Sequence, residues 1–411
     1  MFIVDKRIFT VKNIFKNCLI LAVSALVFAV VSPAFSSPGT VLYDRVWKLI
    51  NAKYVDRTNN HQEWSKWRNR YDDKIKTDED AYVAIETMLA SLNDPYTKFL
   101  DPKEFKEETS SISGSLKGIG VQIGVKDGKL LIIAPIEDTP GEKAGLKAED
   151  EILEIDGKST KGITVDKAAE RIRGEEGTYV RLLVRRKNAP DKVYNVQRAN
   201  IVIKYVSTKL PANFKLNPEV GYIRLSSFIS QNAITEFKQV LKGNSDKKGF
   251  IIDIRSNPGG LLTNAIYLSD MFLNGGIIVS TVDRDGYKDT ARATRQYLCD
   301  KPLVILIDGG SASASEIFSG AMKDNGRALI VGEKSFGKGL VQEINKLDNG
   351  AGCNITIQKY LTPNGTDINK KGIEPDVKVT LTEQDIKNKH DAQLEKAQSL
   401  LLKMIAYSYK K

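Results

Sequence analysis

Lys338 stands between two glycines in the stretch GEKSFGKGLVQ, which begins at Gly332. The stretch nearly matches the phosphate-binding pattern G-x-x-x-x-G-K-[ST], but Gly339 occupies the position where a hydroxyl group is needed to bind magnesium. A lysine with its ordinary pKa of about 10.4 is protonated at neutral pH and accepts no proton from a serine. Because burial lowers the pKa of a lysine, a base packed among small residues is one interpretation, and a surface lysine in a glycine turn is the other. Gln342 lies four residues on, where one helical turn would align the two side chains.

Three serines lie close together in VILIDGGSASASEIFSGA, namely Ser311, Ser313 and Ser315. The run predicts a strand, a Gly-Gly turn and a helix that begins near Ala314. This arrangement exposes a side chain beside free backbone amides, as a nucleophile requires. On these grounds alone each of the three serines is a candidate.

A third segment, DIRSNPGG, ends a predicted buried strand and turns into a helix at Pro258, Gly259 and Gly260. Successive backbone N–H groups at the start of a helix can stabilise an oxyanion. A plain strand-to-helix turn explains the same residues.

Histidine and metal chemistry have little support in the sequence. The two histidines, His61 and His390, lie in polar surroundings, and no H-E-x-x-H motif occurs. Cys18 falls in the N-terminal apolar run, which leaves Cys299 and Cys353 able to pair in an oxidising compartment. The sequence therefore predicts neither a metal ion nor another cofactor.

The distribution of charge argues against nucleic acid as a partner. The formal net charge is +10 over 411 residues, but the lysines are mixed with acidic residues, as in KEFKEE, and form no stripe with aromatic residues between them. With 41% hydrophobic residues, the chain can bury a sizeable core and divide into two or three domains.

The N-terminus has the pattern of a secretory signal. Basic residues precede an apolar run from Cys18 to Val31, and small residues follow it. Because a membrane-spanning helix needs roughly 20 apolar residues, residues 1–36 are predicted to be a signal peptide, with an uncleaved anchor as the alternative. Export would place the protein in a periplasm or a thylakoid lumen, and peripheral association with the membrane stays open.

Hydrophobic spacing divides the remaining chain into three parts. Residues 37–112 have helical spacing and form an N-terminal helical region. Residues 113–200 contain short alternating runs and form a compact β-rich unit. Residues 201–411 alternate apolar strands with helical patterns, which predicts an α/β core with a mainly parallel sheet. The tail after Thr382 has the pattern of a closing amphipathic helix.

Four blocks of the sequence together resemble the carboxyl-terminal processing peptidases, a family of Ser-Lys proteases. These blocks are DIRSNPGG, GSASASEIFSGA, GEKSFGKGLVQ and YLTPNGTDINKKGIEPDV. The β-rich unit is similar to the family's PDZ domain, with GIGVQIG as its carboxylate-binding loop. The resemblance implies a crotonase-like α/β core with an inserted PDZ domain. The N-terminal pattern is similar to the branch found in photosynthetic cells, which trims a photosystem II subunit.

The resemblance assigns roles to five residues of the core. It implies that Ser313 is the nucleophile, that Lys338 is its general base and that Gln342 orients the lysine. The backbone amides of Gly259 and Ala314 would form the oxyanion hole. These roles imply a serine endopeptidase that cleaves exported proteins near their C-termini without a metal ion.

The resemblance also implies where the C-terminus of a substrate binds. Ile119, Gly120 and Val121 match the loop whose amides hold a terminal carboxylate, so that the peptide adds a strand to a sheet edge; a simple β-turn is the alternative. Arg173 has a ligand-sensing role in this interpretation, or is an exposed arginine at a helix end. The expected partners are proteins or peptides with a free C-terminus, and the oligomeric state stays open. An inert adaptor that binds C-termini without cutting them is the competing function, and the presence of both a serine and a lysine argues against it.

Overall fold

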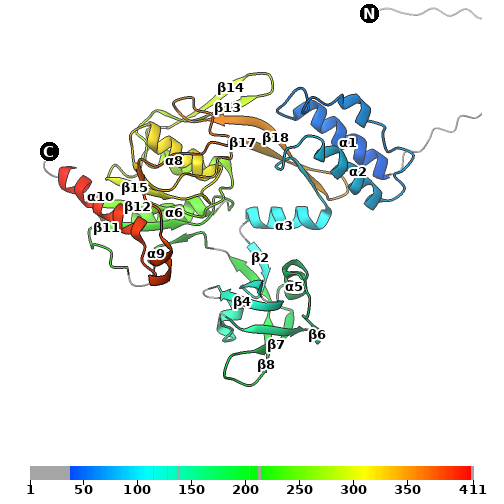
Figure 1. The fold of residues 1–411 in the computed structure, drawn as a ribbon, viewed down its shortest axis with the longest axis horizontal. Coiled ribbons are helices and arrows are strands. Elements are labelled where there is room, and N and C mark those ends of the chain that lie inside the picture. Colours follow the sequence, from blue (N-terminus) through cyan, green and yellow to red (C-terminus); the bar gives the residue numbers. More distant parts are fainter. Residues whose placement is uncertain are drawn as a thin grey trace, which may run out of the picture.

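The computed structural model describes residues 38–408, with short gaps at residues 114, 127, 137–138, 148, 203, 212–213 and 231. The predicted signal peptide at residues 1–36 lies outside the described residues. Figure 1 shows a helical unit, a β-rich unit and an α/β core, with helix α3 (Pro102–Ser113) lying between them. No helix in the described ranges is long and apolar enough to cross a membrane.

The helical unit consists of two main helices that pack on each other and on a core strand. Its elements are α1 (Pro38–Lys53), the 3-10 helix η1 (Trp64–Trp67), α2 (Asp78–Ala90), β1 (Lys98–Leu100) and α3. Thr77 caps α2, because its hydroxyl accepts a hydrogen bond from the Asp80 N–H while the Asp80 carboxylate accepts one from the Thr77 N–H. Strand β1 pairs antiparallel with β18 (Gly352–Leu361), so the helical unit supplies one edge strand of a core sheet.

The described part of the β-rich unit contains a six-stranded antiparallel sheet (β3 to β8), a separate two-stranded sheet (β2 and β9), short helices and its own core. Its elements are β2 (Ser115–Gly118), β3 (Val121–Lys126), β4 (Lys129–Pro135), α4 (Pro140–Lys143), β5 (Glu151–Ile155), β6 (Lys158–Ser159), α5 (Val165–Ile172), β7 (Tyr179–Arg185), β8 (Lys192–Gln197) and β9 (Ala199–Val202). Alternate residues of β7, such as Val180 and Leu182, are fully buried. Strands β2 and β9 pair antiparallel, so the chain enters and leaves this unit through neighbouring strands.

The core contains two sheets. The first has the order β10 (Val206–Ser207), β11 (Val220–Leu225), β12 (Gly249–Asp253), β15 (Leu303–Ile307), β16 (Leu329–Gly332) and β19 (Val377–Lys378). Only the β10–β11 pair in this sheet is antiparallel. The second sheet joins β1, β18, β13 (Ile277–Asp283) and β14 (Lys288–Arg292), with β17 (Leu340–Lys346) also paired to β18, and all of its pairs are antiparallel.

The fold is therefore mixed α/β, and the expectation of a mainly parallel sheet does not describe the second sheet. Strands β17 and β18 form a hairpin across Asp348, Asn349 and Gly350, which are turn-forming residues between two runs of strand-forming residues. These turn residues indicate an antiparallel hairpin, which the alternation of strands and helices along the sequence does not indicate.

Helices cover both faces of the first core sheet. On one face lie α6 (Ala233–Gly243), α7 (Leu262–Asp270) and α8 (Ala314–Asp324), and on the other lies α10 (Ala392–Ser408). Strand β12 serves both faces, because Phe250 and Ile252 pack in the cluster with α6–α8 while Ile251 packs in the cluster with α10. The end of β12 thus lies between α8 and α10.

The C-terminal tail forms two helices where the sequence predicts one. Helix α9 (Glu383–Asn388) ends before α10 begins, and Lys389 between them has a φ of 52°. The expected apolar side of α10 is buried through Leu394, Ala397 and Leu401. The break makes Asp391 the residue that caps α10, since its Oδ1 accepts a hydrogen bond from the Leu394 N–H.

The two cysteines of the described chain are both free thiols. Cys299 packs in the cluster around α7 and α8, whereas Cys353 packs in the cluster of the helical unit. They form no disulfide.

Candidate active site

Ser313 is the residue immediately before helix α8 and has an unusual backbone conformation. Its φ is 55° and its ψ is −113°, a region that non-glycine residues occupy rarely. The other two candidate serines are fully buried and their hydroxyls are used within the chain. The Ser311 hydroxyl donates to the carbonyl of Ile254 (2.9 Å) and the Ser315 hydroxyl to the carbonyl of Asn257 (2.9 Å). Of the three, Ser313 alone lines the cavity described next.

A cavity of about 480 Å³ brings together the five core residues singled out in the sequence. These are Gly259, Ser313, Ala314, Lys338 and Gln342. Its apolar wall comes mainly from Ile229, Leu261, Leu262, Ile317 and Leu340. The cavity therefore contains a hydroxyl, an amine and free space beside an apolar wall.

Lys338 is half-buried, and its Nζ lies 4.5 Å from the centroid of the Tyr96 ring. Burial lowers the pKa of Lys338, the neighbouring charge of Asp94 opposes this shift, and Lys98 adds to it. Lys338 and Ser313 both line the cavity but share no hydrogen bond in this conformation. A lysine with a lowered pKa beside a serine can accept the proton of the hydroxyl once the two approach each other.

Glu316, on the first turn of α8, ties the serine to the lysine loop. Its side chain is fully buried. Its Oε2 accepts hydrogen bonds from the backbone N–H groups of Ser313 (2.8 Å) and Lys338 (2.9 Å). Its Oε1 accepts from the Ser335 hydroxyl (2.5 Å) and the Gly337 N–H (2.7 Å). One carboxylate thus fixes the relative position of the two segments.

The two amides expected at the oxyanion hole differ in their partners. The Gly259 N–H donates to Asn257 Oδ1 (2.9 Å), whereas the Ala314 N–H donates to no described residue. Gly259 has a φ of 95°, and a side chain there would lie 2.6 Å from the carbonyl oxygen of Ala312 and 2.8 Å from the Ala314 nitrogen. Only glycine permits this approach.

Gln342 lies in strand β17, so the prediction that a helical turn aligns it with Lys338 is wrong. The alternating segment from residue 340 to residue 346 pairs with β18, and strand geometry replaces the expected helix. The Gln342 Nε2 donates to the Thr356 hydroxyl at 3.3 Å. Gln342 reaches the cavity without contacting the lysine through a hydrogen bond.

In the β-rich unit, Ile119, Gly120 and Val121 form a tight loop that leads into β3. The Ile119 carbonyl accepts from the Gly141 N–H (2.7 Å), and the Gly120 carbonyl accepts from the Ile136 N–H (2.8 Å). Gly120 has a φ of 72°, which favours glycine. The N–H groups of Ile119 and Gly120 donate to no described residue, which leaves them able to bind an anion.

Arg173 connects the β-rich unit to α3. Its Nη1 lies 2.9 Å from Glu107 Oε1, and a second ion pair of 2.9 Å joins Lys103 to Glu170 on α5. Arg173, just after the end of α5, is therefore not an isolated surface arginine. Among the described residues, no hydrogen bond joins it to the Ile119 loop.

Two stretches of the chain match known families. Residues 219–379 match the model of peptidase family S41, and residues 131–186 match a PDZ domain. A carboxyl-terminal-processing protease of Picosynechococcus sp. is 42% identical over 369 residues, which cover 87% of this chain and 88% of that protein. The chain belongs to peptidase family S41. This membership confirms the prediction of a serine-type peptidase, and the match of residues 131–186 confirms the prediction of a PDZ domain.

Another relative of this S41 peptidase is named as a chloroplastic protein, and a further one has a solved structure. Carboxyl-terminal-processing peptidase 2 of Arabidopsis thaliana is 35% identical over 353 residues, covering 82% of this chain and 68% of that protein. The solved structure of a photosystem II D1 C-terminal processing protease is 32% identical, with a TM-score of 0.56, and the match covers 84% of this chain and 94% of that one.

Several residues at the S41 site could not be identified from the sequence. Tyr360 donates from its hydroxyl to the carbonyls of Lys338 (2.5 Å) and Ser313 (3.1 Å), and so holds both backbones. Tyr96 and Glu108 reach the cavity from the helical unit. The blocks SLNDPYTKFLDP and YLTPNG carry Tyr96 and Tyr360, but only the fold reveals that they meet. Across the described ranges, no cluster of three or more His, Cys, Asp or Glu side chains could hold a metal ion.

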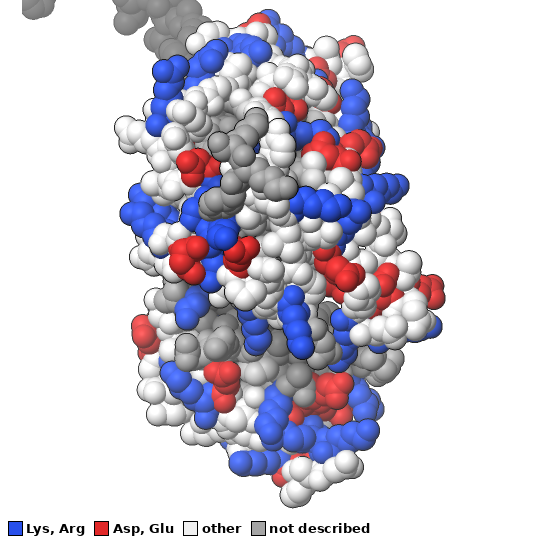
Figure 2. Space-filling model, turned by 90° about the vertical axis from the view of Figure 1, so that its left-hand side faces the viewer, with Lys and Arg blue, Asp and Glu red and all other residues white. Residues whose placement is uncertain are grey.

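The surface of the S41 peptidase has no continuous basic stripe on the face drawn in Figure 2. Lysine and arginine side chains there are interspersed with aspartate and glutamate. This distribution agrees with the sequence pattern, in which basic and acidic residues are mixed.

Proposed function

We propose that this peptidase cleaves proteins near their C-termini with Ser313 as nucleophile and Lys338 as general base. The observation that carries the proposal is that a serine in a strained position and a lysine with a lowered pKa line the same cavity. Glu316 and Tyr360 support it, because they hold the backbones of both residues in place.

In this mechanism the neutral Lys338 amine takes the proton of the Ser313 hydroxyl while the serine oxygen attacks the peptide carbonyl. The negative charge that develops on the carbonyl oxygen is stabilised by backbone N–H groups. The Ala314 N–H is available, and the Gly259 N–H joins it after leaving Asn257 Oδ1. The Lys338 ammonium then protonates the departing amine, and water hydrolyses the acyl-serine with the lysine again acting as base. Gln342 would orient the lysine once a substrate is bound.

The PDZ domain supplies the proposed specificity for C-termini. The names of the relatives state carboxyl-terminal processing, and the amides of Ile119 and Gly120, which donate to no described residue, suit a terminal carboxylate together with that of Val121. We assign residues 37–112 to a helical region, 113–200 to the PDZ domain and 201–411 to a crotonase-like protease core. Export by a signal peptide at residues 1–36 to a periplasm or thylakoid lumen, with peripheral membrane association, completes the proposal.

The proposed dyad is tested by hydrolysis of an unstructured protein, with the products read by mass spectrometry. Ser313→Ala and Lys338→Ala should each lose essentially all activity, since residues that act as one unit are about equally damaging when removed. Lys334→Ala is the matched control, because Lys334 lies in the same loop, is exposed and forms an ion pair with Glu374 rather than lining the cavity. Wild-type turnover by Ser313→Ala would refute the nucleophile, and equal losses in the two lysine variants would refute the base.

A further inference from the structure

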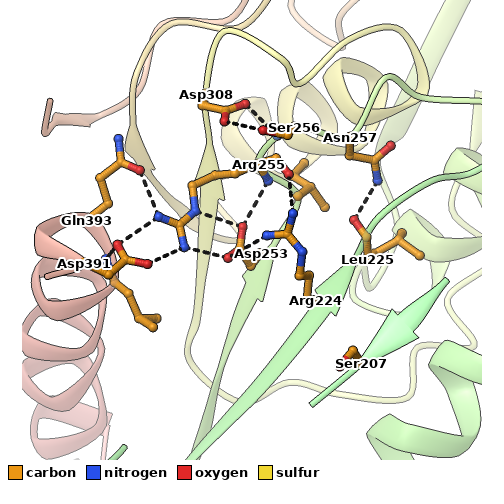
Figure 3. A network of polar contacts seen from close by, with 12 residues as sticks. Ser207, Arg224, Leu225, Asp253, Arg255, Ser256, Asn257, Asp308, Asp391 and Gln393 are labelled. Carbon is orange, nitrogen blue, oxygen red and sulfur yellow. Dashed lines mark hydrogen bonds and ion pairs between the residues drawn. The ribbon is translucent and has the colours of Figure 1, made fainter. Parts of the chain in front are cut away.

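A buried ion network lies at the end of β12, on the sheet face that α10 covers (Figure 3). Arg255 is its centre. The arginine Nε donates to Asp253 Oδ1 (3.0 Å), and Nη2 donates to Asp253 Oδ2 (2.7 Å) and Asp391 Oδ2 (2.8 Å). Nη1 donates to Asp391 Oδ1 (2.9 Å) and Gln393 Oε1 (3.0 Å). Asp253 is fully buried and Arg255 is 8% exposed, so all three guanidinium nitrogens are held inside the protein.

The residues that follow Arg255 are held on their other side by the segment that precedes α8. The Ser256 N–H and hydroxyl donate to the two carboxylate oxygens of Asp308, at 2.7 and 3.0 Å. The carbonyl of Asn257 accepts from the Ala312 N–H at 3.0 Å. The short loop that ends at Gly259 is therefore fastened at one end to α10 and along its length to the serine loop.

This loop borders open space and has a strained backbone. A cavity of about 570 Å³ is lined by Arg224, Arg255, Ser256 and Asp308, on the side away from the proposed catalytic cavity. Ser256, which is not a glycine, has a φ of 55°. Sparsely populated conformations persist only where the surroundings impose them, and here open space borders the loop on one side. The Gly259 carbonyl accepts hydrogen bonds from the Phe228 N–H (2.7 Å) and the Ser227 hydroxyl (3.0 Å), and the Arg255 network holds the opposite end of the loop, beside that space.

We propose that Arg255 is a positioning residue for the oxyanion-hole amide of Gly259, and that Asp391 of the C-terminal helix holds Arg255 in place. The inference rests on the proposed function, because it assumes that Gly259 stabilises the oxyanion. The network sets where the Asn257–Gly259 segment lies relative to Ser313. Asp391 comes from the C-terminal part of the chain. Its contact with Arg255 would thereby control the rate of the chemical step rather than the binding of substrate.

Two conservative variants test this role. Asp391→Asn removes the charge but keeps an oxygen to cap α10 through the Leu394 N–H. Arg255→Lys keeps the charge but cannot bind two carboxylates through a planar fork. Because loss of one oxyanion donor costs about 10²–10³ in kcat, a displaced donor should lower kcat by about tenfold to a hundredfold, with KM changed by less than about twofold.

The control variant is Arg327→Lys. Arg327 contacts the segment that leads into β15, whereas Asp308 lies in the segment that follows β15. Arg327 is half-buried, and its guanidinium donates to the carbonyls of Phe272 (2.7 Å), Cys299 (2.9 Å) and Lys301 (2.9 Å). The Arg327→Lys variant should have a lower melting temperature but no selective fall in kcat. All variants are assayed at a temperature where circular dichroism shows them fully folded.

Each outcome decides the inference. A selective fall of kcat in both network variants, absent from Arg327→Lys, supports it. Unchanged kcat, a parallel change of kcat and KM, or unfolding of the network variants alone would overturn it and leave the network as a stability element. Ser313→Ala is run in parallel: if that variant stays active, the proposed function fails, whereas inactive Ser313→Ala with unaffected network variants refutes the positioning role only.

Discussion

At the level of single residues, the proposed chemistry depends on the protonation state of Lys338. In the proposed mechanism the neutral amine is the active form, and burial lowers the pKa of this lysine from its ordinary value. The positively charged neighbour Lys98 acts in the same direction, while Asp94 and Glu108 favour the ammonium form. If Lys338 is the base, this balance sets the pH at which the enzyme becomes active.

We expect kcat/KM to rise as the pH climbs through the lowered pKa of Lys338 and to level off above it, because the free amine is then fully populated. The pH profile of peptide hydrolysis measures this. The double variant His61→Asn, His390→Asn should keep the same ascending limb. A limb that disappears with the histidines would assign the base to a histidine.

At the level of single residues, only part of the site could be predicted from the sequence. The choice of Ser313 over Ser311 and Ser315 follows from the family resemblance, and the hydrogen bonds of the latter two give an independent physical reason for it. The four hydrogen bonds to Glu316 could not be predicted, because they depend on how two distant segments meet. The bond from the Gly259 N–H to Asn257 likewise depends on local turn geometry.

At the level of elements, the C-terminal tail is the clearest case of partial prediction. Its apolar spacing correctly predicts the buried side of α10, because helical periodicity is a local property. The break after α9 was not predicted, and neither was the strand conformation of residues 340–346, which comes from pairing with β18. Pairing across a sheet is a tertiary interaction and can override local preference.

His390 lies in the segment between α9 and α10, and it makes the stability of that segment depend on pH. Its Nδ1 lies 2.7 Å from Asp385 Oδ1 and its Nε2 lies 3.0 Å from Glu395 Oε2. Hydrogen bonds to Asp385 and then to Glu395 raise the pKa of His390. A hydrogen bond from the Thr382 hydroxyl, and then one from His390, lower the pKa of Asp385 to about 2.

A histidine with a raised pKa in the folded state stabilises that state below its unfolded pKa, and the contribution disappears as the pH rises through the folded value. We therefore expect His390→Asn to lower the melting temperature below about pH 6.5, the ordinary pKa of histidine, and to have little effect at alkaline pH. Thermal unfolding of both proteins across this range measures the difference. A melting-temperature gap that stays constant with pH would show that the ring acts by packing alone.

At the level of the whole molecule, α3 contacts both the PDZ domain and the cavity lined by Ser313 and Lys338. Ion pairs join its Lys103 and Glu107 to the PDZ side, while Glu108 lines the cavity and accepts hydrogen bonds from the side chain of Asn354 at 2.8 and 3.1 Å. A substrate held by the PDZ domain would therefore approach the cavity past one helix. The distance between the two sites along a bound chain limits where cleavage occurs.

The loop at Ile119 should make hydrolysis depend on the C-terminal carboxylate of the bound chain. If the amides of Ile119, Gly120 and Val121 hold a free carboxylate, the loss of its charge should weaken capture, since each charge-assisted hydrogen bond contributes about 1.5–3 kcal/mol. Amidation of the C-terminus should then raise KM by about tenfold or more. An apolar last residue should be preferred to Asp-Asp, because Val121 and Ile123 are partly buried against the apolar PDZ core beside the loop. The measurement compares one unstructured protein that ends in a free apolar residue, in its amide and in Asp-Asp. Equal hydrolysis of all three would refute C-terminal recognition while leaving the chemistry at Ser313 intact, since that chemistry acts on the peptide bond and not on the terminus.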